Sequence, residues 1–93
     1  MRSPNKRAQT VLEAAHVSKV AQLDCVVCNE PGPSVVHEPE QGLWFASVAL
    51  CPACHGGPGF PEGWHGTRLR WKLRKMTELK AINETLRRVA MID

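Results

Sequence analysis

The sequence has no apolar run of membrane-spanning length, no internal repeat and no low-complexity tract. The first absence predicts that the protein has no membrane partner. No apolar signal segment follows Met1, because Arg2, Lys6 and Arg7 lead instead toward a polar helix; we therefore expect a cytoplasmic protein. The chain is also short, and its 93 residues make one small domain with a thin apolar core. Domains of this size commonly need a staple such as a metal ion or a disulfide.

The cysteines are the candidates for such a stabilising metal site or crosslink. The chain has four cysteines, and they form two Cys-x-x-Cys pairs, Cys25/Cys28 and Cys51/Cys54. Two thiolates three positions apart on a tight turn can face one ion, and two such turns supply the four sulfurs of tetrahedral zinc. Two disulfides are the alternative, but they suit secreted proteins, whereas thiols in a reducing cytosol are available for metal. We predict a structural Zn²⁺, whose binding free energy would also be folding free energy.

The first half of the chain predicts a helix and a β-hairpin around these pairs. Residues 9–23 have the pattern of an amphipathic helix capped near Thr10. After the first cysteine pair, two apolar runs at 34–37 and 43–50 are typical of a hairpin. The face of the helix expected to be buried consists of Val11, Leu12 or Ala15, Val20 and Leu23.

The second half predicts an irregular loop followed by helices. Repeated Gly and Pro rule out a continuous helix over residues 55–66. A helical period returns at Thr67, and Thr77 with Glu78 could cap a second helix, giving helices at about 68–75 and 78–91. The apolar stripe expected on them is Leu69, Leu73, Met76, Leu79, Ile82, Leu86 and Val89. Together these patterns predict a flexible basic arm at 1–8 and a single small α+β zinc-stabilised domain at 9–93.

Positive charge is concentrated in the segment from residue 68 to residue 80. Twelve Lys and Arg against nine Asp and Glu give a net charge of +3, which permits nucleic-acid binding without requiring it. A charge run is most often a solvated helix face, and that interpretation stays open here. The clustered cations are Arg68, Arg70, Lys72, Arg74, Lys75 and Lys80.

Three histidines form a second set of potential ligands. Four thiolates already complete a zinc shell, so His37, His55 and His65 are not needed there. Held near a rigid cysteine turn, they could bind a second divalent ion or deprotonate water, because imidazole titrates near neutral pH. Each could instead be an ordinary hydrogen-bonding surface residue, which is the interpretation we give to His16.

At this point the chain resembles the HNH, or ββα-metal, nucleases, and among them the RecA-dependent nucleases of phage recombination enhancement and related small prophage HNH proteins. The resemblance covers residues 16–89, about four-fifths of the chain. Its specific parts are the segment from Leu50 to His55, which reads Leu-Cys-Pro-Ala-Cys-His, and the His65-Gly66 pair ten residues later. His37 with Gly42 five positions on, and Thr77-Glu78 opening the last helix, also carry it.

The resemblance implies a β-hairpin and helix that clasp a catalytic divalent ion, braced by a four-cysteine zinc site, with an N-terminal helix and one or more C-terminal helices. His37 would be the general base, while His55 and His65 would bind Mg²⁺ or Mn²⁺, with Ni²⁺ or Zn²⁺ as alternatives. DNA would be the substrate, cut in a bacterial host cytoplasm, with a recombinase or another phage protein as a further partner. The implied phosphate contacts are Arg68, Arg70, Lys72, Arg74 and Lys75.

Two positions depart from the family pattern. Many relatives carry a ligand directly before the base, where this chain has Val36; if the register slips by one residue, His37 becomes the ligand and Glu38 stands at the base position. The Asn of the family name is missing, because Ser47 is the only polar residue from 44 to 50.

A second function therefore stays open. The chain could be a zinc-braced HNH fold without turnover that binds nucleic acid or a protein through its basic helix and the aromatic residues Trp64 and Trp71. Packing of Trp71 against the hairpin is the alternative that we favour for that residue. Either protein could be a monomer or a dimer through the last helix.

Overall fold

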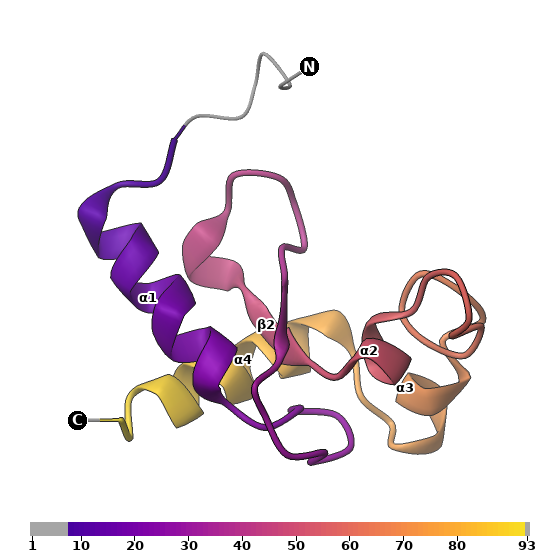
Figure 1. Ribbon diagram of the computed structural model, residues 1–93. Helices are drawn as coiled ribbons and strands as arrows, with labels where there is room; N and C mark the ends of the chain where they lie inside the picture. The colour runs from indigo at the N-terminus through magenta and orange to yellow at the C-terminus, as the bar shows by residue number, and fades with distance from the viewer. Residues whose placement is uncertain (1–7, 93) are drawn as a thin grey trace.

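The computed structural model describes residues 8–92, so the predicted basic arm at 1–8 lies almost wholly outside the described part of the chain. A two-stranded sheet packs against helices of a small α+β fold (Figure 1). Within residues 8–92, no helix has the length and apolar character of a membrane span. In chain order the elements are helix α1 (Val11–Gln22), strand β1 (Val35–His37), the 3₁₀ turn η1 (Trp44–Ala46), strand β2 (Val48–Leu50), and helices α2 (Pro52–His55), α3 (Leu69–Leu73) and α4 (Glu78–Val89).

Helix α1 begins at the predicted cap. The hydroxyl of Thr10 accepts a hydrogen bond from the backbone N–H of Glu13 at 3.1 Å, and the Glu13 carboxylate accepts from the Thr10 N–H at 2.8 Å. This reciprocal capping box satisfies two backbone donors that the first turn of a helix leaves without partners. The predicted buried face is only partly right. Val20 is fully buried, whereas Val11 is 86% exposed and Leu12 is 74% exposed.

The predicted hairpin forms, with a shorter second strand. β1 pairs antiparallel with β2, so that Val35 lies opposite Leu50 and His37 opposite Val48. Residues 44–46 form η1 instead of strand, and the Ser47 hydroxyl donates to the carbonyl oxygen of Trp44 at 2.5 Å. The chain therefore turns before it pairs, and all of β2 is buried. Its side chains line the core between α1 and α4.

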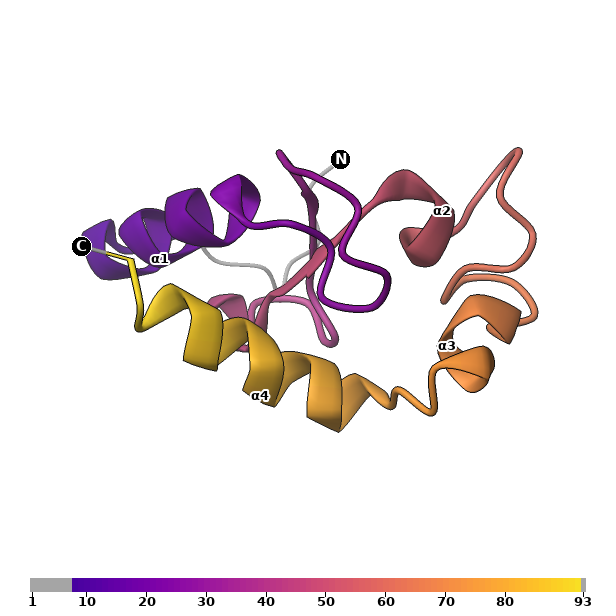
Figure 2. The ribbon, with the colours of Figure 1, turned by 90° about the horizontal axis from the view of Figure 1, so that it is seen from below.

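The C-terminal segment divides where the sequence predicts. Lys75 has a positive φ of 52°, which ends the helical run that contains α3. The Thr77 hydroxyl then caps α4 by accepting from the Lys80 N–H at 3.1 Å. Seen from below, α1 and α4 lie at one end of the molecule and α2 and α3 at the other (Figure 2).

The apolar stripe predicted on α3 and α4 is only partly buried, since Met76, Ile82 and Val89 pack against the core while its leucines are exposed. Leu73 is 70% exposed, Leu79 is 77% exposed and Leu86 is 42% exposed. The fully buried residues of α4 are instead the small ones, Ala81 and Thr85. Small side chains let the helix approach β2 closely.

Trp71 joins the C-terminal half to the core. Its side chain is 1% exposed, and its indole Nε1–H donates to the carbonyl oxygen of Cys54 at 2.8 Å. The ring also packs against that of Trp64, with centroids 4.8 Å apart. The burial expected of a packing role for Trp71 is therefore confirmed, although these contacts are with Cys54 and Trp64 and not with the hairpin. Its interpretation as an exposed aromatic is wrong.

Replacement of Trp71 by Phe tests this connection. The variant keeps an aromatic ring but removes one of the two hydrogen bonds to the Cys54 carbonyl and leaves space where the larger indole packed. The free energy of unfolding should therefore fall by about 1–3 kcal/mol. Urea unfolding of the zinc-loaded protein measures the change. The exposed Leu73→Ala control should change it by no more than about 0.5 kcal/mol; equal losses in the two variants would contradict the proposed importance of the indole.

Candidate metal centres

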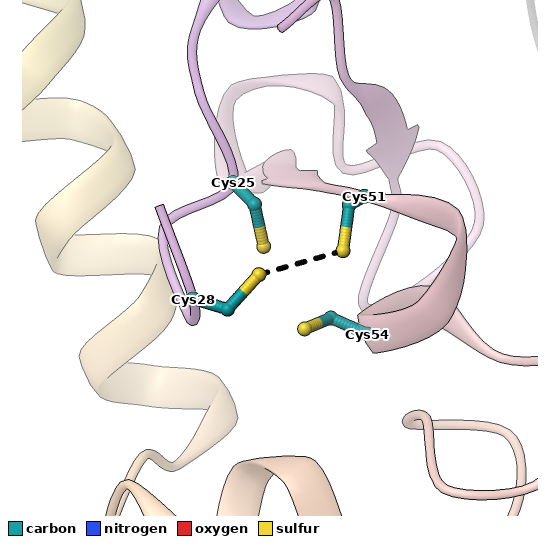
Figure 3. A group of neighbouring side chains, drawn as sticks. All are labelled: Cys25, Cys28, Cys51 and Cys54. Atoms are coloured by element: carbon teal, nitrogen blue, oxygen red, sulfur yellow. Dashed lines mark hydrogen bonds between the residues drawn. The ribbon is translucent and has the colours of Figure 1, made fainter. Parts of the chain in front are cut away.

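The four cysteines come together as predicted. Their sulfur atoms all lie within 4.8 Å of one another, and the Sγ atoms of Cys28 and Cys51 are 3.6 Å apart. Figure 3 shows the side chains converging from the turn after α1 and from the start of α2. No pair is bonded as a disulfide. The two-disulfide alternative therefore does not describe this arrangement.

Backbone hydrogen bonds hold each cysteine turn in shape. In the first turn, the Asn29 N–H donates to the Cys25 carbonyl at 2.8 Å, and Asn29 takes the positive φ of 64° that the turn requires. In the second, the His55 N–H donates to the Cys51 carbonyl at 2.9 Å. The Val26 N–H donates to Ala49 at 3.0 Å, which ties the first turn to the sheet. These backbone hydrogen bonds thus fix the positions of the four cysteines relative to the sheet.

The charges of these thiols favour a bound cation. A hydrogen bond from the Cys54 thiol lowers the pKa of Cys25 to about 4, and the same interaction raises the pKa of Cys54. Burial raises the pKa of Cys51. The thiols therefore do not ionise together on their own, because each thiolate opposes the next. A zinc ion removes this conflict by neutralising the thiolates. Four sulfurs within reach of one ion are the ligand set of structural zinc.

Three histidines form a second cluster beside the cysteines. One ring nitrogen from each of His37, His55 and His65 lies within 4.8 Å of the other two. The ring centroids of His55 and His65 are 4.7 Å apart, and that of His37 is 5.4 Å and 5.5 Å from theirs. His37 comes from β1, His55 from the end of α2 and His65 from the following loop. The sequence-based prediction that they form one set is confirmed in its geometry.

The loop that carries His65 is fastened to α2. The Trp64 N–H donates to Cys54 O at 2.8 Å, and the His65 N–H donates to His55 O at 3.1 Å. A Cβ on Gly63 would lie 2.3 Å from the backbone nitrogen of Gly56, so only glycine permits this approach. The glycine-rich loop is therefore what brings His65 beside His55.

The lowered pKa of His55 favours metal binding by this cluster. Burial lowers the pKa of His55, and repulsion from His65 and His37 lowers it further. A neutral imidazole has a free lone pair at pH 7, which is the form that binds a metal ion. The exposure of the three side chains increases from buried His37 through half-buried His55 to exposed His65. The site thus opens to solvent on the His65 side.

His37 has a carboxylate partner, Glu78, for which the sequence predicts no role in a site. Its Nε2 lies 3.0 Å from Oε2 of Glu78, the first residue of α4. His37 is 5% exposed, so this contact is largely shielded from water. The sequence offers Glu78 only as a cap neighbour, because 41 positions separate it from His37.

Two of the predicted DNA-contacting residues are held close to the metal centres. The Arg68 guanidinium lies 3.5 Å above the Trp64 ring, and its Nε donates to Trp64 O at 2.8 Å. Arg70 Nε donates to Cys54 Sγ at 3.3 Å, a contact that raises the pKa of Arg70. Arg70 is half-buried, whereas Arg68 and the remaining cations of the predicted set, Lys72, Arg74 and Lys75, are exposed.

No protein-family model, curated protein or solved structure matches this chain. The HNH resemblance consequently remains a sequence-based expectation. The two ligand clusters are the basis for assigning a function.

Removal of zinc should unfold the domain. Structural zinc contributes about 10–16 kcal/mol in zinc-finger peptides, as much as the whole stability of a typical small domain. We expect the purified chain to contain Zn²⁺ by elemental analysis and to lose its cooperative thermal transition when a strong chelator is added. The His55→Ala/His65→Ala double variant is the control, because it should keep both zinc and fold. A chelated chain that still melts cooperatively at the same temperature would contradict the structural role.

Proposed function

We propose that the protein is a metal-dependent endonuclease of the HNH, or ββα-metal, type that hydrolyses DNA phosphodiester bonds. The observation that carries this proposal is the convergence of His37, His55 and His65, with their ring nitrogens within 4.8 Å of one another. A separate cluster of four cysteines lies next to them and has its own complete ligand set for zinc. The histidines are therefore available for a second ion with catalytic potential.

The order of elements agrees with this proposal. A β-hairpin made of β1 and β2 leads directly into the short helix α2, and the hairpin and helix contribute His37 and His55. Zinc at the cysteines would stabilise this unit where the strand meets the helix, because Cys51 and Cys54 belong to the connection between β2 and α2. The family assignment itself remains part of the proposal.

The histidine cluster suits phosphodiester hydrolysis by one ion. A divalent ion bound there would act as a Lewis acid that stabilises charge on the phosphate and on the leaving oxygen. Mg²⁺ or Mn²⁺ is the expected ion for phosphate chemistry, while imidazole ligands also suit Ni²⁺ or Zn²⁺. His65, as the exposed member, leaves the site accessible to a phosphate at the molecular surface.

Two assignments of His37 follow from its contacts. Its Nε2 is engaged by Glu78, so Nδ1 is the nitrogen left for chemistry. A carboxylate-held imidazole serves either as a metal ligand or as a general base. The proximity of a His37 nitrogen to both other histidines favours the ligand role. Glu38, the next residue, would then stand at the base position, whereas in the competing assignment His37 itself accepts the proton from water.

The alternative function is a zinc-braced module that binds nucleic acid or a protein partner without cleavage. One observation favours it. The Ser47 side chain, the only polar one in the second strand region, is buried and donates to Trp44 O at 2.5 Å. It therefore cannot orient a catalytic base as the family's Asn does. In either case DNA would contact the exposed cations Lys72, Arg74 and Lys75.

Cleavage assays with separate histidine variants distinguish these functions. Supercoiled DNA incubated with the protein and Mg²⁺, Mn²⁺ or Ni²⁺ should be nicked or linearised, and His55→Ala and His37→Ala should each reduce the rate by at least about 100-fold. Ni²⁺ affinity measured in parallel separates the two roles of His37. Loss of affinity in His37→Ala supports the ligand role, whereas loss of cleavage with affinity retained supports the base role. Absence of cleavage by the wild-type protein with every ion would favour the binding module.

Charge reversal on the exposed cations tests the DNA surface. Lys72→Glu with Arg74→Glu should weaken binding to DNA of any sequence and should reduce the slope of log affinity against log salt by about 2, because two phosphate contacts are lost. The matched control is Arg87→Glu, on the far part of α4. Arg70 is unsuitable for this test because its change would also remove the hydrogen bond to Cys54. An unchanged salt slope in the double variant would contradict the assigned surface.

A further inference from the structure

We propose that Glu78 is a positioning residue for the histidine cluster, and that its carboxylate fixes the tautomer and orientation of His37 so that Nδ1 presents its lone pair to the site. This inference rests on the proposed metal-dependent function but concerns a residue to which neither the sequence nor the family resemblance assigned a role in the site. The contact that carries it is the 3.0 Å separation between His37 Nε2 and Glu78 Oε2.

The chemistry of the pair determines the position of the proton. An ionised carboxylate only accepts hydrogen bonds, so His37 must carry its proton on Nε2 to make this contact. A neutral imidazole protonated on Nε2 has a free lone pair on Nδ1. Nδ1 is then the nitrogen that can bind an ion or accept a proton from water. The Glu78 contact therefore prepares His37 for either of its two proposed roles.

The backbone at Glu78 is also fixed by the cap of α4. Thr77 caps α4 through the Lys80 N–H, so the first turn that contains Glu78 is fixed at its start. Glu78 also lies on the same helix face as Ala81 and Thr85, which are three and seven positions later and fully buried. The carboxylate therefore points toward the interior of the fold, and its side chain is only 28% exposed.

If Glu78 served only to stabilise α4, it would not need to contact His37. An acidic residue in the first turn of a helix interacts favourably with the helix dipole even when its carboxylate is in water. Glu78 instead turns toward an imidazole that is 5% exposed and belongs to a strand 41 positions earlier. Carboxylates that accept from the distal N–H of a metal-binding histidine typically contribute about 10- to 100-fold in metal affinity. The contact links the start of α4 to the end of β1 at the candidate site.

Side-chain NMR of the zinc-loaded protein tests the tautomer without any second metal. Long-range ¹H–¹⁵N spectra above pH 7 should give His37 the signature of a proton on Nε2. In Glu78→Ala that preference should be lost, while Glu78→Gln should retain part of it because the amide oxygen still accepts from Nε2. Glu84→Gln is the matched control, since it removes the same charge from the same helix away from the histidines.

Titration of the same proteins with Ni²⁺ gives the second readout. Glu78→Ala should bind Ni²⁺ about 10- to 100-fold more weakly than the wild-type protein, with an intermediate loss in Glu78→Gln. Zinc content and far-ultraviolet circular dichroism should be unchanged in all variants, which separates positioning from unfolding. A proton on Nδ1 of His37, or an unchanged tautomer and Ni²⁺ affinity in a folded Glu78→Ala variant, would overturn the proposal.

The two proposals fail in different ways. If the wild-type protein cleaves no DNA but Glu78→Ala changes the tautomer and weakens Ni²⁺ binding, the positioning role stands and the nuclease assignment fails. If cleavage occurs and both readouts are insensitive to Glu78, the nuclease assignment stands and the positioning role fails.

Discussion

The repulsion that would arise among four buried or half-buried thiolates is the constraint on which the rest of the structure depends. Cys25 and Cys28 follow α1, whereas Cys51 and Cys54 join β2 to α2, so the sulfurs connect parts of the chain that are otherwise held by a thin core. They cannot all ionise in one place without a cation. A bound zinc ion would turn this unfavourable cluster into the strongest crosslink of the domain.

The positions of the histidine side chains depend on the cysteine turns. His55 follows Cys54 directly, and the loop to His65 is fastened through the hydrogen bond from Trp64 to the Cys54 carbonyl. The same carbonyl also accepts from the indole of Trp71. A distortion at Cys54 would therefore reach two of the three histidines. This arrangement explains how a chain with so small a core can hold a second set of potential metal ligands close together.

The local features of the fold could be predicted from the sequence, but their orientation could not. Caps at Thr10 and Thr77 depend on residues a few positions apart, and the cysteine turns depend on their spacing. Periodicity alone did not identify the buried face of α4, because Ala81 and Thr85 are small and one of them is polar. The contact between His37 and Glu78 depends on how β1 meets α4, and no local pattern encodes that meeting.

The cations of the basic segment differ in their contacts within the fold. A zinc ion with four thiolates carries a net double negative charge, which a small domain must offset nearby. Arg70 donates to Cys54 and therefore serves this need, while Arg68 is stacked on Trp64. The Arg and Lys residues between 68 and 75 are thus not equivalent in their surroundings. Arg70 is held against the cysteine turn, whereas Arg68, Lys72, Arg74 and Lys75 are exposed.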